Sequence, residues 1–344
     1  MDKVKKYNNI DALRTFGCLA IIAWHVKANM DFRGGVLLER IIPSFDYLVY
    51  LFMMISGFGM CNGYYEKMKS GSYDLNSFYL KRYKKIVPFF ALLIVLNCIV
   101  ELKVENITEG LMEITLLFGF LPNNTLSVIG VAWTLGAIFA FYIIFPFIVF
   151  LLYNKHRGVG AFVVSVGIAF MCQMYFMTDK FVTEGFVMRH SFLYCLPFFL
   201  CGGLIYLYRD EIVNLVKAKK VASIICCITL TVLYLVTPDE LLSTDIIVLK
   251  TLLLYASWLF VALGVDSVVL SNSFTTYISG ISMEMYLAHM VVFRIIDKLH
   301  LSSVFGHGVL DYMVTYFWVV VLLIVGIAIY RKMESSVRLK IFAK

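Results

Sequence analysis

The strongest constraint on this chain is a series of apolar runs, each long enough to cross a lipid bilayer. A transmembrane helix needs about 20 mostly apolar residues, and such segments recur along the chain between charged, Gly or Pro residues. We predict an all-α, polytopic membrane protein with about ten transmembrane helices. They cover residues 10–28, 44–65, 86–103, 131–153, 159–177, 190–208, 221–237, 246–265, 276–297 and 309–330.

Composition excludes an ordinary soluble enzyme. Hydrophobic residues make up 61% of the chain and charged residues 15%, against roughly 45–50% and 25% in soluble domains. We expect residues 1–344 to form a single transmembrane domain with no appended soluble domain. Such a chain would be a multi-pass protein of the cell (plasma) membrane. Residues 111–121 are apolar but too short to span, which favours an interfacial or re-entrant segment.

The charge distribution predicts the orientation in the membrane. A formal net charge of +7 could indicate a nucleic-acid partner, but multispanning proteins also collect Lys and Arg in their cytoplasmic loops. Most of the 30 Lys and Arg residues fall in the segments that are cytoplasmic if both termini are. We therefore predict an N-in, C-in protein whose surroundings are the lipid bilayer, with no nucleic-acid partner.

Charged and imidazole side chains inside predicted spans are costly and therefore mark candidate functional sites. Four of them stand out: Arg14, His25, Glu284 and His289. Arg14 and His25 are eleven residues apart, so both lie on one helix face, about 16 Å apart along the axis. The first interpretation is functional: one helix face carries a cation near its cytoplasmic end and an imidazole farther along, as a reaction linking the two sides of a membrane would require. The alternative is structural: Arg14 extends to lipid phosphates and His25 makes an interhelical hydrogen bond.

The other two, Glu284 and His289, lie in the ninth predicted span and are about 140° apart around it. Glu284 is best explained by an ion pair with Arg14 or with a cation of the basic loop. His289 is a weaker candidate than His25. The remaining histidines lie at span ends or in loops, where we expect solvent around them: His156, His190, His300 and His307.

A basic stretch, Lys81–Phe90, opens the third predicted span. Positive residues in this position commonly anchor a protein to anionic lipid. Arg82 and Lys85, however, lie one helical turn apart on one face, a spacing suited to binding a phosphate group. The spacing leaves both interpretations open.

Five segments, taken in order, resemble the acyltransferase-3 family of integral-membrane acyltransferases. NIDALRTFGCLAIIAWHV resembles its first-helix motif through Arg14 and His25. LFMMISGF carries Ser56, FYLKRYKKIVPFF carries Arg82, and Lys85 stands where the family usually has Arg. The last two segments, AWTLGAIFAFYIIFP and ISMEMYLAH, match through Trp133, Tyr142 and His289. Ile138 and Phe139 stand where larger members with a fused domain often carry Glu, so the likeness is closer to the short, stand-alone branch acting on surface polysaccharides.

The resemblance implies an O-acyltransferase that uses acyl-CoA, with acetyl-CoA as the default donor, and a glycan or lipid-linked saccharide as acceptor. The CoA phosphates would lie near Arg82, Lys84 and Lys85 on the cytoplasmic side. His25, with a reference pKa of about 6.5 for imidazole, would act as general base or as transient acyl carrier. No permanently bound cofactor and no metal are expected.

Two other classes of function remain open on sequence grounds. A transporter or flippase for a lipid-linked saccharide would use Arg14, His25 and Glu284 to line a conduit, although inverted halves are not visible. A structural subunit of a polysaccharide-export complex would use its many Phe and Tyr side chains for packing. In the acyltransferase interpretation, the further candidates for pore-lining or structural roles are Ser56, Trp133, Tyr142, Glu284 and His289. Acyl-CoA thioester cleavage separates the enzyme from both.

Overall fold

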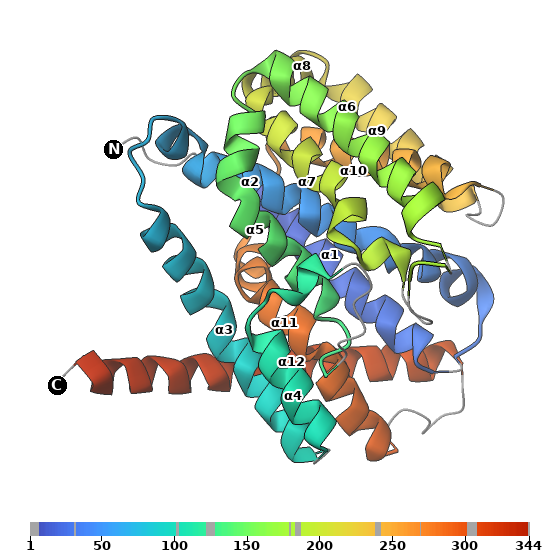
Figure 1. The fold of residues 1–344 in the computed structure, drawn as a ribbon. Coiled ribbons are helices and arrows are strands. Elements are labelled where there is room, and N and C mark those ends of the chain that lie inside the picture. Colours follow the sequence, from blue (N-terminus) through green and yellow to red (C-terminus); the bar gives the residue numbers. More distant parts are fainter. Residues whose placement is uncertain are drawn as a thin grey trace. The chain divides into compact units, whose positions relative to one another are not determined.

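The computed structural model describes residues 7–30, 32–100, 103–121, 128–178, 180–182, 187–237, 242–268, 270–300 and 308–342. In this part of the chain 84% of residues are helical and no strand occurs (Figure 1). The all-α prediction is therefore confirmed. Lys3, Lys5, Lys6 and Lys344, counted above as cytoplasmic charges, lie outside the described residues.

Each predicted apolar segment overlaps a helix. The corresponding helices are α1 (Asn8–Ala28), α2 (Val49–Lys69), α3 (Leu75–Val100), α5 (Trp133–Leu151), α6 (Lys155–Met171), α7 (Phe192–Leu207), α9 (Lys220–Val236), α10 (Thr244–Gly264), α11 (Ser273–Lys298) and α12 (Val309–Phe342). Shorter helices lie between them: η1 (Leu37–Ile41), η2 (Pro43–Leu48), α4 (Val104–Ile114), η3 (Phe118–Phe120), η4 (Cys172–Phe176), η5 (Met188–His190) and α8 (Arg209–Ala218).

Fewer helices meet a strict test for membrane spans. Among the described residues, five helical segments are long and apolar enough to cross a bilayer, and a sixth appears if α7 and α8, bent by 74°, are taken as one span. The five segments are Leu37–Lys69, Trp133–Leu151, Lys155–Phe176, Thr244–Gly264 and Val309–Ser336. The structure thus supports several apolar helices, whereas the count of ten and the orientation remain predictions.

Two predicted boundaries are wrong. The third segment was expected to begin at residue 86, but α3 begins at Leu75 and continues through Pro88, because the basic residues before the apolar run are good helix formers. Residues 111–121 were expected to form one short segment. Instead, α4 ends at Ile114, and a left-handed backbone at Leu116 (φ 59°) separates it from η3.

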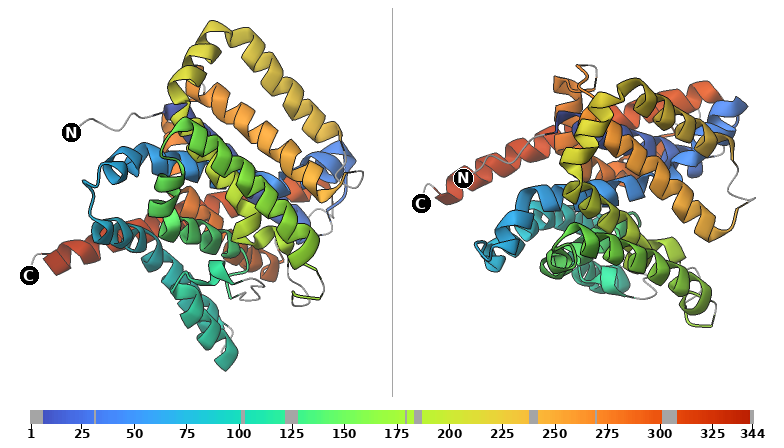
Figure 2. Two further views of the ribbon diagram at one scale, coloured as in Figure 1. Left: turned by 45° about the horizontal axis from the view of Figure 1, so that its top comes forward. Right: turned by 90° about the horizontal axis from the view of Figure 1, so that it is seen from above.

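The chain forms two compact units. We call Met1–Leu13 with Val49–Leu270 the large unit, and Arg14–Leu48 with Ser271–Lys344 the small unit. In the large unit, α2 packs along α7, α6 lies beside α7, and α9 lies beside α10 (Figure 2). A Cβ atom at Gly57 would collide with the carbonyl oxygen of Phe199, and one at Gly202 with that of Met54. The glycine of the SGF motif is therefore required by the close approach of two helices.

The small unit is built from most of α1 together with α11 and α12. The hydroxyl of Tyr312 donates to the carbonyl oxygen of Ala23 over 3.1 Å, which brings the start of α12 against α1. Thr15 on α1 donates to the carbonyl oxygen of Thr275 over 2.8 Å. Asn272 and Thr275 form a reciprocal capping box that fixes the first turn of α11. These contacts position the polar residues of α1 and α11.

Candidate functional site

Arg14 and His25 lie on one uninterrupted helix, as predicted. Because α1 runs continuously from Asn8 to Ala28, the eleven-residue spacing places the two side chains on one face, about 16 Å apart. Both residues belong to the small unit.

The structure brings a second histidine against His25. The imidazole rings of His25 and His289 lie with their centroids 4.8 Å apart and their planes tilted by 47°. The indole ring of Trp24, the residue that precedes His25, also contacts the His25 ring, with centroids 4.3 Å apart. His289 was ranked below His25 on sequence grounds, and its position shows that the two belong to one cluster. We call His25 and His289 the histidine pair.

The protonation of His289 follows from its hydrogen bond. Its Nδ1 atom lies 2.5 Å from the carbonyl oxygen of Tyr286, one turn earlier in α11. A carbonyl oxygen can only accept, so Nδ1 carries the proton and Nε2 of the neutral ring presents a lone pair. The side chain is buried, and Nε2 has no hydrogen-bond partner among the described residues.

Glu284 forms an ion pair, but with a partner that the sequence analysis did not name. A guanidinium nitrogen of Arg331 on α12 lies 2.5 Å from the Glu284 carboxylate and also donates to the carbonyl oxygen of Gly280 over 2.7 Å. The expectation of a pair with Arg14 or the basic loop is replaced by this contact. This contact joins α11 to α12 and so holds the two helices together.

In the large unit, Arg82 lies in an aromatic cage. Its guanidinium carbon is 4.8 Å from the ring centre of Tyr64, 5.6 Å from that of Phe78 and 5.4 Å from that of Tyr142. The guanidinium also donates a hydrogen bond to the Tyr64 hydroxyl. Such rings stabilise a cation through their electron-rich faces. We call Arg82 with Tyr64, Phe78 and Tyr142 the arginine cage.

The arginine cage and the neighbouring Ser56 together connect three of the sequence segments. Ser56 on α2 and Tyr142 on α5 share a hydrogen bond between their hydroxyl groups, 3.1 Å apart. The Nε atom of Arg82 is buried and has no partner among the described residues. A buried N–H of a cation without an acceptor is costly, so this nitrogen is available to an anionic or carbonyl ligand. The position of Phe78 four residues before Arg82 was a usable sequence signal, whereas nothing in the sequence indicated Tyr64.

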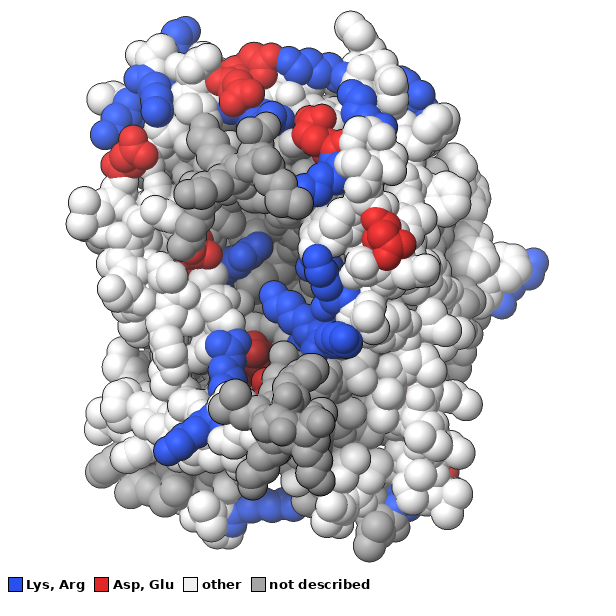
Figure 3. Space-filling model, turned by 90° about the vertical axis from the view of Figure 1, so that its left-hand side faces the viewer, with Lys and Arg blue, Asp and Glu red and all other residues white. Residues whose placement is uncertain are grey.

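Lys84 and Lys85 follow Arg82 on α3, and both are exposed. Figure 3 shows one face of the molecule, on which several Lys and Arg side chains gather. Lys81 is also exposed, and its ammonium group donates to the Tyr73 hydroxyl over 3.0 Å. The basic stretch therefore consists of one half-buried cation and several exposed ones.

Trp133 begins α5 and stacks on His190 of η5, with ring centroids 4.0 Å apart and an angle of 14° between the planes. The expectation that solvent surrounds His190 is therefore wrong. The stacked indole and imidazole rings connect the start of α5 to the turn that precedes α7, so Trp133 makes a structural contact.

Glu113 on α4 is a buried acid that the sequence analysis did not single out. Its carboxylate accepts hydrogen bonds from the backbone N–H of Ile129 over 3.3 and 3.5 Å. Burial raises the pKa of the carboxyl to about 7, and the backbone hydrogen bonds oppose this shift only in part. Glu113 thus ties α4 to the segment that leads into α5.

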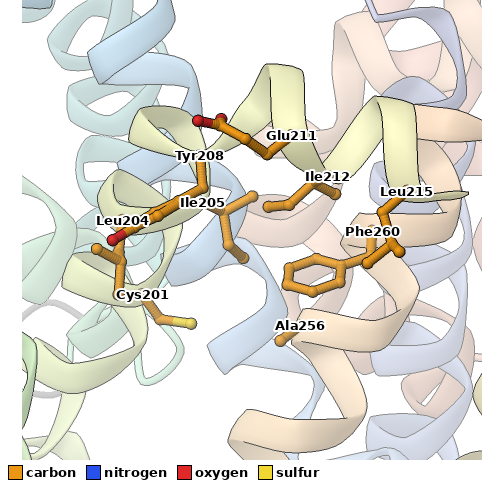
Figure 4. A pocket seen from close by; sticks show the side chains of 9 residues that line it. All are labelled: Cys201, Leu204, Ile205, Tyr208, Glu211, Ile212, Leu215, Ala256 and Phe260. Carbon is orange, nitrogen blue, oxygen red and sulfur yellow. The ribbon is translucent and has the colours of Figure 1, made fainter. Parts of the chain in front are cut away.

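A cavity of about 440 Å³ lies in the large unit between α7, α8 and α10 (Figure 4). Cys201 and Leu204 of α7, Ile212 and Leu215 of α8, and Phe260 of α10 are among its lining residues. Its lining is almost wholly apolar, and no predicted site residue contributes to it. The cavity is therefore separate from the arginine cage.

Comparisons with known proteins give one family model and one relative that match this chain. The family model Acyl_transf_3, described as an acyltransferase domain, matches residues 7–331. An uncharacterized protein from Haemophilus influenzae is 25% identical over 210 residues, which are 54% of this chain and 84% of that protein. No solved structure matches the chain.

Proposed function

Since the chain belongs to the acyltransferase-3 family of membrane acyltransferases, we propose that it transfers an acetyl or similar small acyl group from acyl-CoA to a sugar hydroxyl. The acceptor is a cell-surface polysaccharide or its lipid-linked precursor. The protein is a multi-pass component of the plasma membrane with ten spans and both termini in the cytoplasm. Acyl-CoA approaches from the cytoplasmic side.

The observation that carries this function is the arginine cage. Ser56, Arg82 and Tyr142 come from three separate sequence segments. In the structure Ser56 hydrogen-bonds to Tyr142, the Tyr142 ring lies against the Arg82 guanidinium, and the Nε of Arg82 has no described partner. Phosphate oxygens of acyl-CoA are strong acceptors for such a donor. The exposed side chains of Lys84 and Lys85 add positive charge for the remaining phosphates. Lys85 supplies a point charge where Arg would supply a two-pronged donor.

His25 supplies the proton transfer. Its imidazole takes the proton of the acceptor hydroxyl as the oxygen attacks the thioester carbonyl carbon. The new C–O bond forms, the C–S bond breaks, and the CoA thiolate leaves and takes up a proton. In a second route His25 attacks the thioester itself and passes the acyl group to the hydroxyl. Arg14, on the same face of α1, orients the reacting groups or neutralises a phosphate.

The position of His25 along α1 supports an acceptor on the extracytoplasmic side, and the family supplies its chemical class, a glycan hydroxyl. His25 lies about 16 Å beyond Arg14, near the end of the helix at Ala28. In the proposed orientation this is the extracytoplasmic half of the membrane. A soluble cytosolic acceptor would have to travel that far, whereas a glycan on the outer side would not.

Purified protein with acetyl-CoA is the direct test. Release of free CoA thiol, followed with a colorimetric thiol reagent, is expected for the wild type and is expected to be lost in His25→Ala. Movement of a lipid-linked saccharide without thiol release would indicate a transporter instead. Mass spectrometry of surface glycan from a deletion strain tests the acceptor. Unchanged O-acylation under conditions of expression would exclude the proposed acceptor class.

A further inference from the structure

We propose that His289 is a positioning residue whose Nε2 lone pair accepts a hydrogen bond from the His25 imidazolium when His25 holds the substrate proton. This role rests on the acyl transfer proposed above and adds a second imidazole to it. His25 remains the group that meets the reacting atoms.

The first support is the tautomer of His289. The carbonyl oxygen of Tyr286 lies 2.5 Å from Nδ1 and keeps the proton on that nitrogen. In a histidine side chain Nδ1 is the nitrogen nearer the main chain and Nε2 is the farther one. Since Nδ1 is held by the α11 backbone, Nε2 lies on the part of the ring that extends away from α11.

The second support is the place of that lone pair. His289 is 1% exposed, and its Nε2 has no partner among the described residues. A buried acceptor without a donor is unfavourable, so this lone pair is open to a donor from an adjacent side chain. The two imidazole rings are in contact, with 4.8 Å between their centroids, which makes His25 the adjacent side chain with N–H groups to offer.

The third support is chemical. A neutral His25 that acts as base has one N–H, and its other nitrogen is kept for the substrate proton. After it takes that proton, the imidazolium has two N–H donors and a positive charge. A neutral imidazole acceptor stabilises this charged form without adding a charge of its own, and a hydrogen bond to a charged group is stronger than one between neutral groups.

Other titratable groups lie in the same unit as His25. Lys27 is on α1, Tyr286 is on α11, and α12 contributes Asp311 and Tyr312 at the turn that contacts Ala23. Asp311 is buried and could favour the same imidazolium. The effect of His289 must therefore be measured with Asp311 unchanged, and an Asp311→Asn variant should be measured in parallel.

Two substitutions distinguish the effect of the Nε2 lone pair of His289 from the effect of the shape of its ring. His289→Asn keeps a donor close to the position of Nδ1, which can still bind the Tyr286 carbonyl, but has no atom at the position of Nε2. His289→Gln places an amide oxygen or nitrogen at the Nε2 position and can present an acceptor there. Comparing the two variants therefore tests the Nε2 lone pair while both keep an uncharged polar side chain.

The test follows the reactivity of His25 toward diethyl pyrocarbonate, which acylates the neutral ring, as a function of pH in detergent-solubilised full-length protein. Mass spectrometry quantifies the modified His25 peptide. We expect the pH midpoint for His25 to fall by about one unit in His289→Asn, since the imidazolium loses an acceptor, and to stay near wild type in His289→Gln. Equal midpoints in all three proteins, or equal shifts in both variants, would overturn the role.

A measurement on the wild type covers the case in which a variant fails to fold. Nitrogen-15 NMR of histidine-labelled protein should show His289 neutral and protonated at Nδ1. The opposite tautomer would refute the role without any substitution. Neither measurement uses acyl-CoA or a glycan, so a failure of the proposed acyl transfer would appear separately, as a wild-type protein that releases no CoA thiol.

Discussion

Removal of the Arg82 guanidinium should weaken acyl-CoA binding in a way that removal of a neighbouring surface charge does not. One N–H of the guanidinium donates to the Tyr64 hydroxyl, and the buried Nε of Arg82 has no described partner. If that nitrogen binds a phosphate oxygen, Arg82→Ala loses one charge-assisted hydrogen bond, about 1.5–3 kcal/mol. That loss corresponds to a roughly tenfold to hundredfold higher Kd.

Lys81→Ala is the matched control because it removes the same charge from the same helix. Lys81 is exposed and contacts Tyr73 rather than the arginine cage. Calorimetric titration of each purified variant with coenzyme A, at one ionic strength, gives the Kd values. Thermal unfolding of the same samples shows whether the emptied cage has destabilised the large unit. Arg82→Lys should fall between wild type and Arg82→Ala, because Lys keeps the charge and lacks the planar donors.

Two results would refute this reasoning. A folded Arg82→Ala protein that binds coenzyme A as tightly as wild type would leave the basic stretch as a lipid anchor. Equal weakening by Lys81→Ala and Arg82→Ala would show that only the net charge of α3 matters, and the geometry of the arginine cage would then have no part in binding.

Three further outcomes are expected. His25→Ala should abolish CoA thiol release and Arg14→Ala should nearly do so, with membrane insertion unchanged on immunoblots; full activity of His25→Ala would remove the proposed catalyst. The raised pKa of Glu113, about 7 against 4.5 unfolded, means that its protonated form favours docking of α4; this stabilisation is complete below pH 4.5 and is lost as pH rises through 7. The protection of the amides of residues 128–132 against hydrogen exchange, measured relative to the intrinsic exchange rate at each pH, should accordingly be weaker at pH 8 than at pH 5 in wild type. In Glu113→Gln this protection should be nearly the same at both pH values. Reporter fusions after Lys69 and Lys344 should both report a cytoplasmic position, and an external signal at either would contradict the N-in, C-in orientation.

Much of the helical content was predictable because it depends on local sequence. Each apolar run overlaps a helix, since a segment in lipid must satisfy its backbone hydrogen bonds internally. The one-face relation of Arg14 and His25 was also predictable, because helical geometry alone sets it once α1 is continuous. The predicted boundaries of the helices were less accurate. At α3, where polar and apolar residues join in one helix, hydropathy located the apolar part only.

The features of the candidate sites also fall into those that the sequence determined and those that only the tertiary structure decided. The sequence by itself determined the membrane class, the helices and the residue types that are costly in lipid, because composition and period are properties of neighbouring residues. Only the tertiary structure decided that His289 meets His25, that Arg331 pairs with Glu284, and that Tyr64 and Tyr142 enclose Arg82. These contacts join residues on different helices. Which helix faces meet depends on close packing, as at Gly57 against Phe199, and a single sequence carries no direct record of which surfaces lie together.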